Sequence, residues 1–171
     1  MPDITAAELS RRLIGRLARN GRVVMPNAYI LGSPWESDVI VVTPRFYWDE
    51  YEIKLSIADY KADFRKKSNK YSTGVLKHEV YASDADVAHR KYGKFVTLPK
   101  PAHFTFVTPP GLLIGIELPA HCGLAEIDGR VMNWIKQPPR LRPATRLGER
   151  VIFNLAMKAA SRLMYEQRKH S

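Results

Sequence analysis

The hydrophobic positions near the N-terminus repeat at helical spacing. Leu9, Leu13 and Leu17 share one face of residues 5–19, and Thr5 can cap the first turn, so we predict a helix here. Similar patterns predict a short strand over 23–31, a strand over 38–43, a helix over 57–69, a strand over 103–108, a hairpin over 123–137 and a basic helix over 145–169.

Residues 48–56 alternate between two faces, which predicts a strand that forms a hairpin with the strand before it. One face carries Trp48, Glu50, Glu52 and Lys54, and the other carries Asp49, Tyr51, Ile53 and Leu55. Together with the other elements, this strand predicts an α/β or α+β sheet with flanking helices.

The 171 residues suit one domain, and no linker or repeat divides them. Residues 70–102 are poorly patterned and hold five lysines, which predicts a long basic loop of the kind that is often functional. A single cysteine, Cys122, excludes a disulfide framework and a multi-cysteine zinc site. The chain lacks an apolar run of about 20 residues and an N-terminal apolar signal core, so we expect a cytoplasmic protein without a membrane partner.

The formal net charge of +10 is unevenly placed along the chain. Residues 130–171 hold ten Lys/Arg and two Asp/Glu, whereas residues 1–129 hold 17 and 15. A basic surface attracts polyanions, and nucleic acid is the first candidate partner.

Asp38 and Glu52 are predicted near the same end of two neighbouring strands. Residues two apart in a strand face the same way, so Lys54 projects beside Glu52. Two carboxylates and the backbone carbonyl of Ile53 would make an oxygen site suited to Mg²⁺ or Mn²⁺, and Lys54 would hold a metal-activated water. The alternative is that Asp38 only begins a strand, while Glu52 and Lys54 form a solvated pair.

This arrangement resembles the signature of the PD-(D/E)XK nuclease superfamily. The stretch ESDVIVVTPRFYWDEYEIKLSIADYKADFRKKSNKY is similar to the MmcB-like and phage-encoded branch, in which the E-x-K strand runs into a helix with two aspartates and a basic end. Asp59, Asp63 and the RKK run match that helix, and HFTFVTPPGLL followed by LPAHCGLAEID is similar to a later strand and loop of the same branch. The resemblance covers roughly residues 36–71 and 103–136.

The resemblance implies a restriction-endonuclease-like mixed central sheet flanked by helices, with an αβββαβ core. It implies Asp38, Glu52 and Lys54 as catalytic residues, with Mg²⁺ or Mn²⁺ bound by Asp38, Glu52 and the carbonyl of Ile53. An additional carboxylate would come from Glu8 or Glu36, although Glu8 also fits a capping box. Ser37 stands where the motif has a proline.

The resemblance also implies a Mg²⁺-dependent endodeoxyribonuclease of DNA repair, recombination or phage DNA processing, acting on duplex or branched DNA in a bacterial or phage-infected cytosol. A homodimer is one arrangement known for this fold. The residues expected to hold phosphates are Lys61, Arg65, Lys66, Lys67, Lys70, Lys91, Lys94, Arg140, Arg142 and Arg146. The alternatives are a non-catalytic nucleic-acid-binding module on the same fold and an RNA-processing or RNA-binding domain.

Simpler roles are expected for several other residues. Asp63 is expected to pair with Lys66 or Lys67 on the helix surface. The histidines lack the paired spacing of a zinc site, so they are expected to be structural or solvated. Trp48 is the tryptophan to test for stacking on a base.

Overall fold

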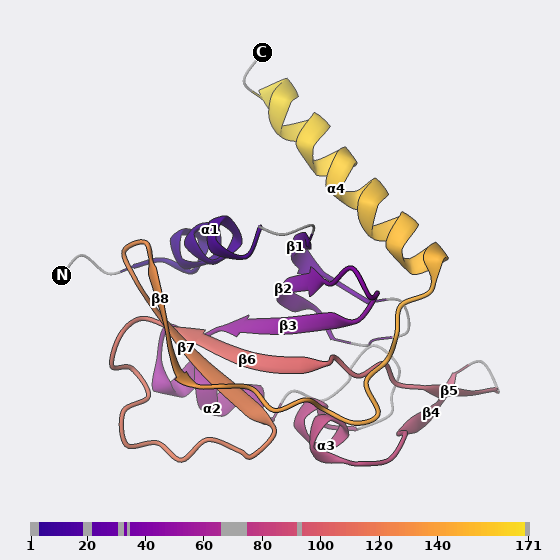
Figure 1. The fold of residues 1–171 in the computed structure, drawn as a ribbon, viewed down its shortest axis with the longest axis horizontal. Coiled ribbons are helices and arrows are strands. Elements are labelled where there is room, and N and C mark those ends of the chain that lie inside the picture. The colour runs from indigo at the N-terminus through magenta and orange to yellow at the C-terminus, as the bar shows by residue number, and fades with distance from the viewer. Residues whose placement is uncertain are drawn as a thin grey trace.

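A six-stranded mixed sheet forms the centre of the computed structural model, with helices on both of its faces (Figure 1). The structure describes residues 4–18, 22–30, 33, 35–65, 75–91 and 94–169. For residues 88–91, 94–96, 162–163 and 166–169 it describes the backbone and not the side chains. The elements are α1 (Ala6–Leu17), β1 (Val23–Ala28), β2 (Ser37–Val42), β3 (Trp48–Ile53), α2 (Ile57–Asp63), α3 (Lys77–Ala82), β4 (Ala88–Lys91), β5 (Lys94–Thr97), β6 (His103–Thr108), β7 (Cys122–Asp128), β8 (Val131–Lys136) and α4 (Glu149–Lys169).

The strand order of the main sheet is β1-β2-β3-β6-β7-β8. Neighbouring strands run antiparallel, except that β3 pairs with β6, and β6 with β7, in parallel. Parallel pairing requires a crossover connection, and the segment from α2 to β5 joins β3 to β6. The α/β class, the mixed sheet with flanking helices and the order α1-β1-β2-β3-α2 followed by β6 confirm the predicted architecture.

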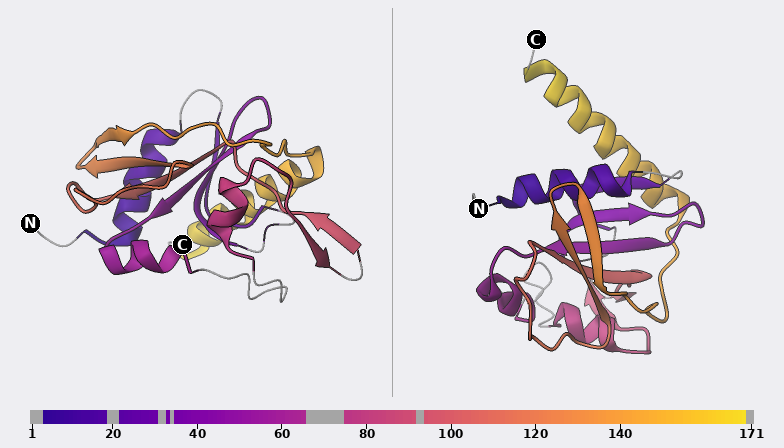
Figure 2. Two further views of the ribbon diagram at one scale, coloured as in Figure 1. Left: turned by 90° about the horizontal axis from the view of Figure 1, so that it is seen from below. Right: turned by 60° about the vertical axis from the view of Figure 1, so that its left-hand side comes forward.

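The two faces of β3 bury different kinds of side chain. Tyr51 and Ile53 face α1 and pack with its leucines Leu9, Leu13 and Leu17. The opposite face carries Glu50, Glu52 and Lys54 beside the aromatic residues of β6, and α2 and α3 cover this side (Figures 1 and 2). The alternation predicted for this strand is therefore confirmed, but all six residues of β3 are buried.

The C-terminal helix α4 starts four residues later than predicted. Before it, Thr145 N–H donates to the carbonyl of Lys100, and Leu147 N–H donates to that of Phe46. These contacts tie residues 145 and 147 to neighbouring loops outside any helix, and the helix begins at Glu149. Leu147 and Leu155 pack against β1 and β2, and beyond them α4 extends away from the sheet (Figure 1). None of the helices in the described part of the chain is long and apolar enough to cross a membrane.

The expectation of a long loop over residues 70–102 is wrong. This segment contains the helix α3 and the hairpin β4–β5. Residues 66–74 lie outside the described residues, and they include the last part of the helix predicted over 57–69. Helix α3 has six residues, and four of them are buried, among them Lys77 and His78. A helical apolar stripe was absent from the sequence because polar side chains occupy buried positions.

Candidate functional site

Asp38 lies at the Glu52–Ile53 peptide, at the shared end of β2 and β3. Its Oδ2 accepts a hydrogen bond of 2.7 Å from the backbone N–H of Ile53. The antiparallel pairing of Val39 with Tyr51 brings this end of β2 against the Glu52 end of β3. Asp38 is half-buried, whereas Glu52 is fully buried. The two predicted metal ligands therefore come from neighbouring positions of the sheet, one at the surface and one inside.

Lys54 follows directly after β3, and its ammonium group is held by carboxylates. Its Nζ lies 2.8 Å from Asp63 Oδ1 and 3.4 Å from Glu52 Oε2. Asp59 Oδ1, from a side chain that is 48% exposed, lies 3.9 Å from the same nitrogen. Asp59 and Asp63 share one face of α2 because they are four residues apart. Lys54 is thus fixed in position, and its contact with the exposed Asp59 places it close to the protein surface.

A second lysine, Lys77 of α3, lies among three buried carboxylates. Its Nζ is 2.6 Å from Glu52 Oε1, 3.2 Å from Glu50 Oε1 and 3.6 Å from Asp63 Oδ2. Burial opposes the charged form of Lys77, but the three carboxylates outweigh it and raise its pKa above the ordinary lysine value. We call Glu50, Glu52, Lys54, Asp63 and Lys77 the ionic cluster. In it, three carboxylates face two ammonium groups.

Glu50 is the member of the ionic cluster with the most altered titration. Tyr81 Oη donates a hydrogen bond of 2.5 Å to its Oε2. Burial raises the pKa of Glu50 to about 7, against the opposing effect of Lys77, and the charge of Glu52 adds to the increase. Burial also raises the pKa of Tyr81 well above its usual value, so the phenol stays protonated and continues to donate.

The Glu50→Gln variant should gain stability relative to the wild type as the pH rises from 4.5 to 7.5. The unfolded chain releases the Glu50 proton near its ordinary pKa, 4.5, whereas the folded protein keeps it to about 7. Stability falls with pH wherever the folded state binds more protons, and glutamine removes this loss. Urea midpoints of both proteins, measured across this range, give the difference. A difference that did not change with pH would contradict the assignment.

Three further side chains converge beside the ionic cluster, at α3 and the start of β7. His78 Nδ1 lies 2.9 Å from His121 Nε2, and His78 Nε2 lies 2.7 Å from Asp63 Oδ2. Ligand atoms of His78, His121 and Cys122 all lie within 4.8 Å of one another. The expectation that these histidines are only structural or solvated overlooked this arrangement, because 43 residues separate the two imidazoles along the chain.

Burial lowers the pKa of both imidazoles of this group and raises that of the thiol. The pKa of His121 falls to about 4, since burial, His78 and Lys136 all disfavour its charged form. The pKa of His78 is also lowered by burial, although Asp63 opposes the effect. Burial raises the pKa of Cys122 to about 12. At neutral pH the group is therefore two neutral imidazoles and a thiol.

The two candidates for an additional carboxylate have contacts of their own. Glu8 accepts hydrogen bonds from Arg11 and Arg12, and these lower its pKa, with Arg12 the largest cause. Its N–H donates to Thr5 Oγ1, which is the threonine half of the predicted capping box. Glu36 is exposed and hydrogen-bonds to Tyr29. Among the described residues, the carboxylate oxygens of Asp38 and Glu52 do not lie within 4.8 Å of one another and of a carboxylate oxygen of Glu8 or Glu36.

The predicted phosphate-binding residues fall into two exposed groups. Lys61 lies on α2 and Arg65 two residues after its end. Arg140, Arg142 and Arg146 precede α4 and are exposed. The side chains of Lys91 and Lys94, and all of Lys66, Lys67 and Lys70, lie outside the described residues.

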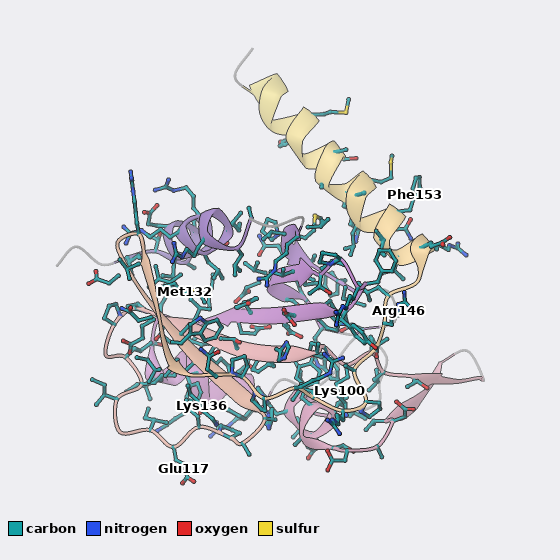
Figure 3. The ribbon with its side chains drawn as sticks, viewed as in Figure 1. Lys100, Glu117, Met132, Lys136, Arg146 and Phe153 are labelled. Carbon is teal, nitrogen blue, oxygen red and sulfur yellow. The ribbon has the colours of Figure 1, made fainter. Side chains whose placement is uncertain are left out.

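The arginine group lies at the opposite end of β3 from Lys54. Arg140 stacks over Tyr47 and Arg146 over Phe46, with guanidinium-to-centroid distances of 4.6 and 5.5 Å (Figure 3 labels Arg146). Since a strand rises about 3.3 Å per residue, roughly 20 Å separates this turn from the Glu52 end. A nucleic acid that contacted both groups of basic residues would therefore have to extend along the length of β3.

Three predictions about the interior are corrected by the structure. Lys77 and Lys100, two lysines of the expected basic loop, are buried, and Lys100 Nζ donates to the carbonyls of Ser83, Ala85 and Arg142 (Figure 3). Asp63 is buried against Lys54 rather than paired on the helix surface. Trp48 is 1% exposed and packs in the core, so it cannot stack on a base.

Sequence reasoning missed Glu50, Lys77, His78 and Tyr81 as members of the site. Glu50 carried a usable signal, because it shares a strand face with Glu52 and Lys54. The sequence of α3 gave little signal of this kind, because the contacts of Lys77 with Glu50 and Glu52 depend on how α3 packs against β3 in the folded protein.

Comparison with known proteins supports the fold. No protein-family model matches the chain, and no curated protein matches it either. A solved structure of a protein of unknown function from Silicibacter pomeroyi is similar, with a TM-score of 0.60 and 19% sequence identity, over 99% of this chain and 96% of that one. At this level of identity the likeness concerns the α/β architecture.

Proposed function

We propose that the protein is a metal-dependent DNA nuclease of the PD-(D/E)XK type that acts in a bacterial or phage-infected cytoplasm. One observation carries the proposal. Asp38 is hydrogen-bonded to the peptide that follows Glu52, and the Lys54 ammonium lies 3.4 Å from the Glu52 carboxylate. An aspartate, a glutamate and a lysine thus meet at one end of the mixed sheet, in the order and spacing of the D…ExK motif.

The donor chemistry of these residues fits Mg²⁺ or Mn²⁺. Both ions prefer oxygen ligands, and Asp38 and Glu52 supply two carboxylates at adjacent strand ends. A carbonyl ligand from Ile53 and an additional carboxylate from Glu8 or Glu36 stay predictions. When bound, such a metal lowers the pKa of a coordinated water and polarises a phosphate oxygen.

Lys54 would place its charge next to the scissile phosphate. Asp63 fixes the ammonium at 2.8 Å, so its position is set before substrate arrives. A positioned cation stabilises negative charge that develops on the phosphate oxygens without further reorganisation. Lys61 and Arg65, which are exposed, would neutralise neighbouring phosphates, and the arginines near Tyr47 would hold a more distant stretch of the DNA.

The test is cleavage by the full-length protein. Linear, nicked, single-stranded and branched DNA, with matched RNA, would be incubated with the protein in Mg²⁺, in Mn²⁺ and in EDTA. We expect metal-dependent cleavage of at least one DNA substrate and none in EDTA. Wild-type protein that left every substrate intact in both metals would overturn the proposal, and cleavage of RNA alone would move it to an RNA-processing enzyme.

A second candidate function, a non-catalytic nucleic-acid-binding module, is favoured by one specific contact. Lys77 Nζ lies 2.6 Å from Glu52 Oε1, so an internal ammonium competes with a metal for this carboxylate. Such a module would bind DNA through its exposed cations, and its affinity would be unchanged by metal and by Asp38→Asn. Metal-independent, salt-sensitive binding by an inert protein would therefore support it.

A further inference from the structure

His78, His121 and Cys122 bring two imidazoles and a thiol together outside the D…ExK residues. His78 comes from α3, whereas His121 and Cys122 stand at the start of β7. His78 is 6% exposed and Cys122 is fully buried, and His121 is half-buried on the outer side. This is the only group of three or more His, Cys, Asp or Glu residues that the described part of the chain places closely enough to hold a metal ion.

The hydrogen bonds of His78 fix which nitrogen can bind a cation. Asp63 Oδ2 lies 2.7 Å from His78 Nε2, and a carboxylate accepts the proton that this nitrogen carries. The other nitrogen, Nδ1, then presents its lone pair towards His121 Nε2 at 2.9 Å. A carboxylate behind a ligating histidine is the usual outer partner of a metal site, where it orients the ring.

The spacing of the ligand atoms suits a small tetrahedral ion. Zn–N bonds of about 2.0–2.1 Å at a tetrahedral angle separate two nitrogens by about 3.3 Å. From their present 2.9 Å, the two nitrogens would have to separate by about 0.4 Å, and both rings would have to turn so that their lone pairs meet at the metal instead of facing each other. The thiol lies within the 4.8 Å that encloses all the ligand atoms. Imidazole and thiolate favour zinc over Mg²⁺, which prefers oxygen.

We propose that His78, His121 and Cys122 bind Zn²⁺ through two nitrogens and one thiolate sulfur, with water as the fourth ligand and the thiol proton of Cys122 released to solvent. Zinc at this place joins α3 to the start of β7. Helix α3 also carries Lys77 and Tyr81, which contact Glu50 in the ionic cluster. The ion would therefore stabilise the position of α3, which supplies Lys77 to the ionic cluster. The proposal does not depend on nuclease activity.

The test is Co²⁺ binding to the full-length protein after dialysis against EDTA. Cobalt replaces zinc in such sites, and a cobalt–thiolate bond gives a near-ultraviolet charge-transfer band. Because Cys122 is the chain's single cysteine, the band reports on this site. We expect one equivalent of Co²⁺ to produce the band, added Zn²⁺ to abolish it, and Cys122→Ser to lack it. His121→Asn should weaken Co²⁺ binding at least tenfold.

Two control variants separate this site from the rest of the molecule. His103→Asn removes an imidazole that pairs with Asp49 elsewhere, and Asp38→Asn removes a proposed Mg²⁺ ligand. Both should keep the band and the affinity, whether or not the protein cleaves DNA. Circular dichroism would verify the fold of each variant. A wild type without the band, or a band that persists at full affinity in folded His121→Asn, would overturn the proposal.

Discussion

The Asp38→Asn variant is expected to lose Mg²⁺-dependent DNA cleavage by at least about a hundredfold while it keeps its fold and its affinity for DNA. The asparagine oxygen can still accept the hydrogen bond from Ile53 N–H, so this contact with β3 is kept. Only the negative charge that would hold the metal is lost. Removal of one preorganised electrostatic group from an active site costs about 10²–10³-fold in rate. Single-turnover cleavage with saturating enzyme measures this loss.

The matched control is Asp128→Asn. Asp128 is exposed at the end of β7, directly before the turn at Gly129 and Arg130, and asparagine has nearly the same shape without the charge. This control should cleave like the wild type. Equal rates for Asp38→Asn and wild type would show that Asp38 has no part in cleavage. A folded Glu52→Gln protein should be as inactive as Asp38→Asn, since it lacks the other carboxylate.

The Lys77→Met variant is expected to lose about 3–5 kcal/mol of unfolding free energy. Lys77 is 1% exposed and is the cation nearest to Glu52. Removing one partner of a buried ion pair leaves an uncompensated charge, which costs this amount in other proteins. The loss should be smaller at pH 5, because Glu50, with its pKa raised to about 7, is already protonated there and one carboxylate fewer is left without its cation. Urea denaturation at pH 5 and pH 8 measures both effects.

Lys158→Met is the control for this prediction. Lys158 is exposed on α4, and the exchange should alter the unfolding free energy by no more than about 0.5 kcal/mol. A Lys77→Met protein as stable as this control would mean that Glu50, Glu52 and Asp63 do not depend on Lys77 for their charge balance.

The main sheet could be predicted from the sequence because its strands follow simple patterns. β2 is a run of β-branched residues, β3 alternates, and the hairpin predicted around Asp128-Gly129 is formed by β7 and β8, with Gly129 and Arg130 in the turn. Helix α3 could not be predicted in this way. Its inward positions include Lys77 and His78, which contact carboxylates from β3 and α2. Local hydrophobic periodicity carries no record of such tertiary partners.

The candidate site was predictable to the same limited degree. The D…ExK spacing pointed to Asp38, Glu52 and Lys54, and the structure brings these three to one end of the sheet. The spacing gave no sign that Lys77 contacts the same glutamate or that Asp63 links Lys54 to His78. These contacts join residues up to 25 positions apart through the packing of α2 and α3 on the sheet.

Anomalous scattering from crystals of the full-length protein soaked in Mn²⁺ tests the central claim, a catalytic metal held by the D…ExK residues, most directly. We predict a peak within bonding distance of both the Asp38 and Glu52 carboxylates in the wild type, absent in Asp38→Asn. A wild-type crystal with Mn²⁺ only at His78, His121 and Cys122, or with none bound, would contradict it.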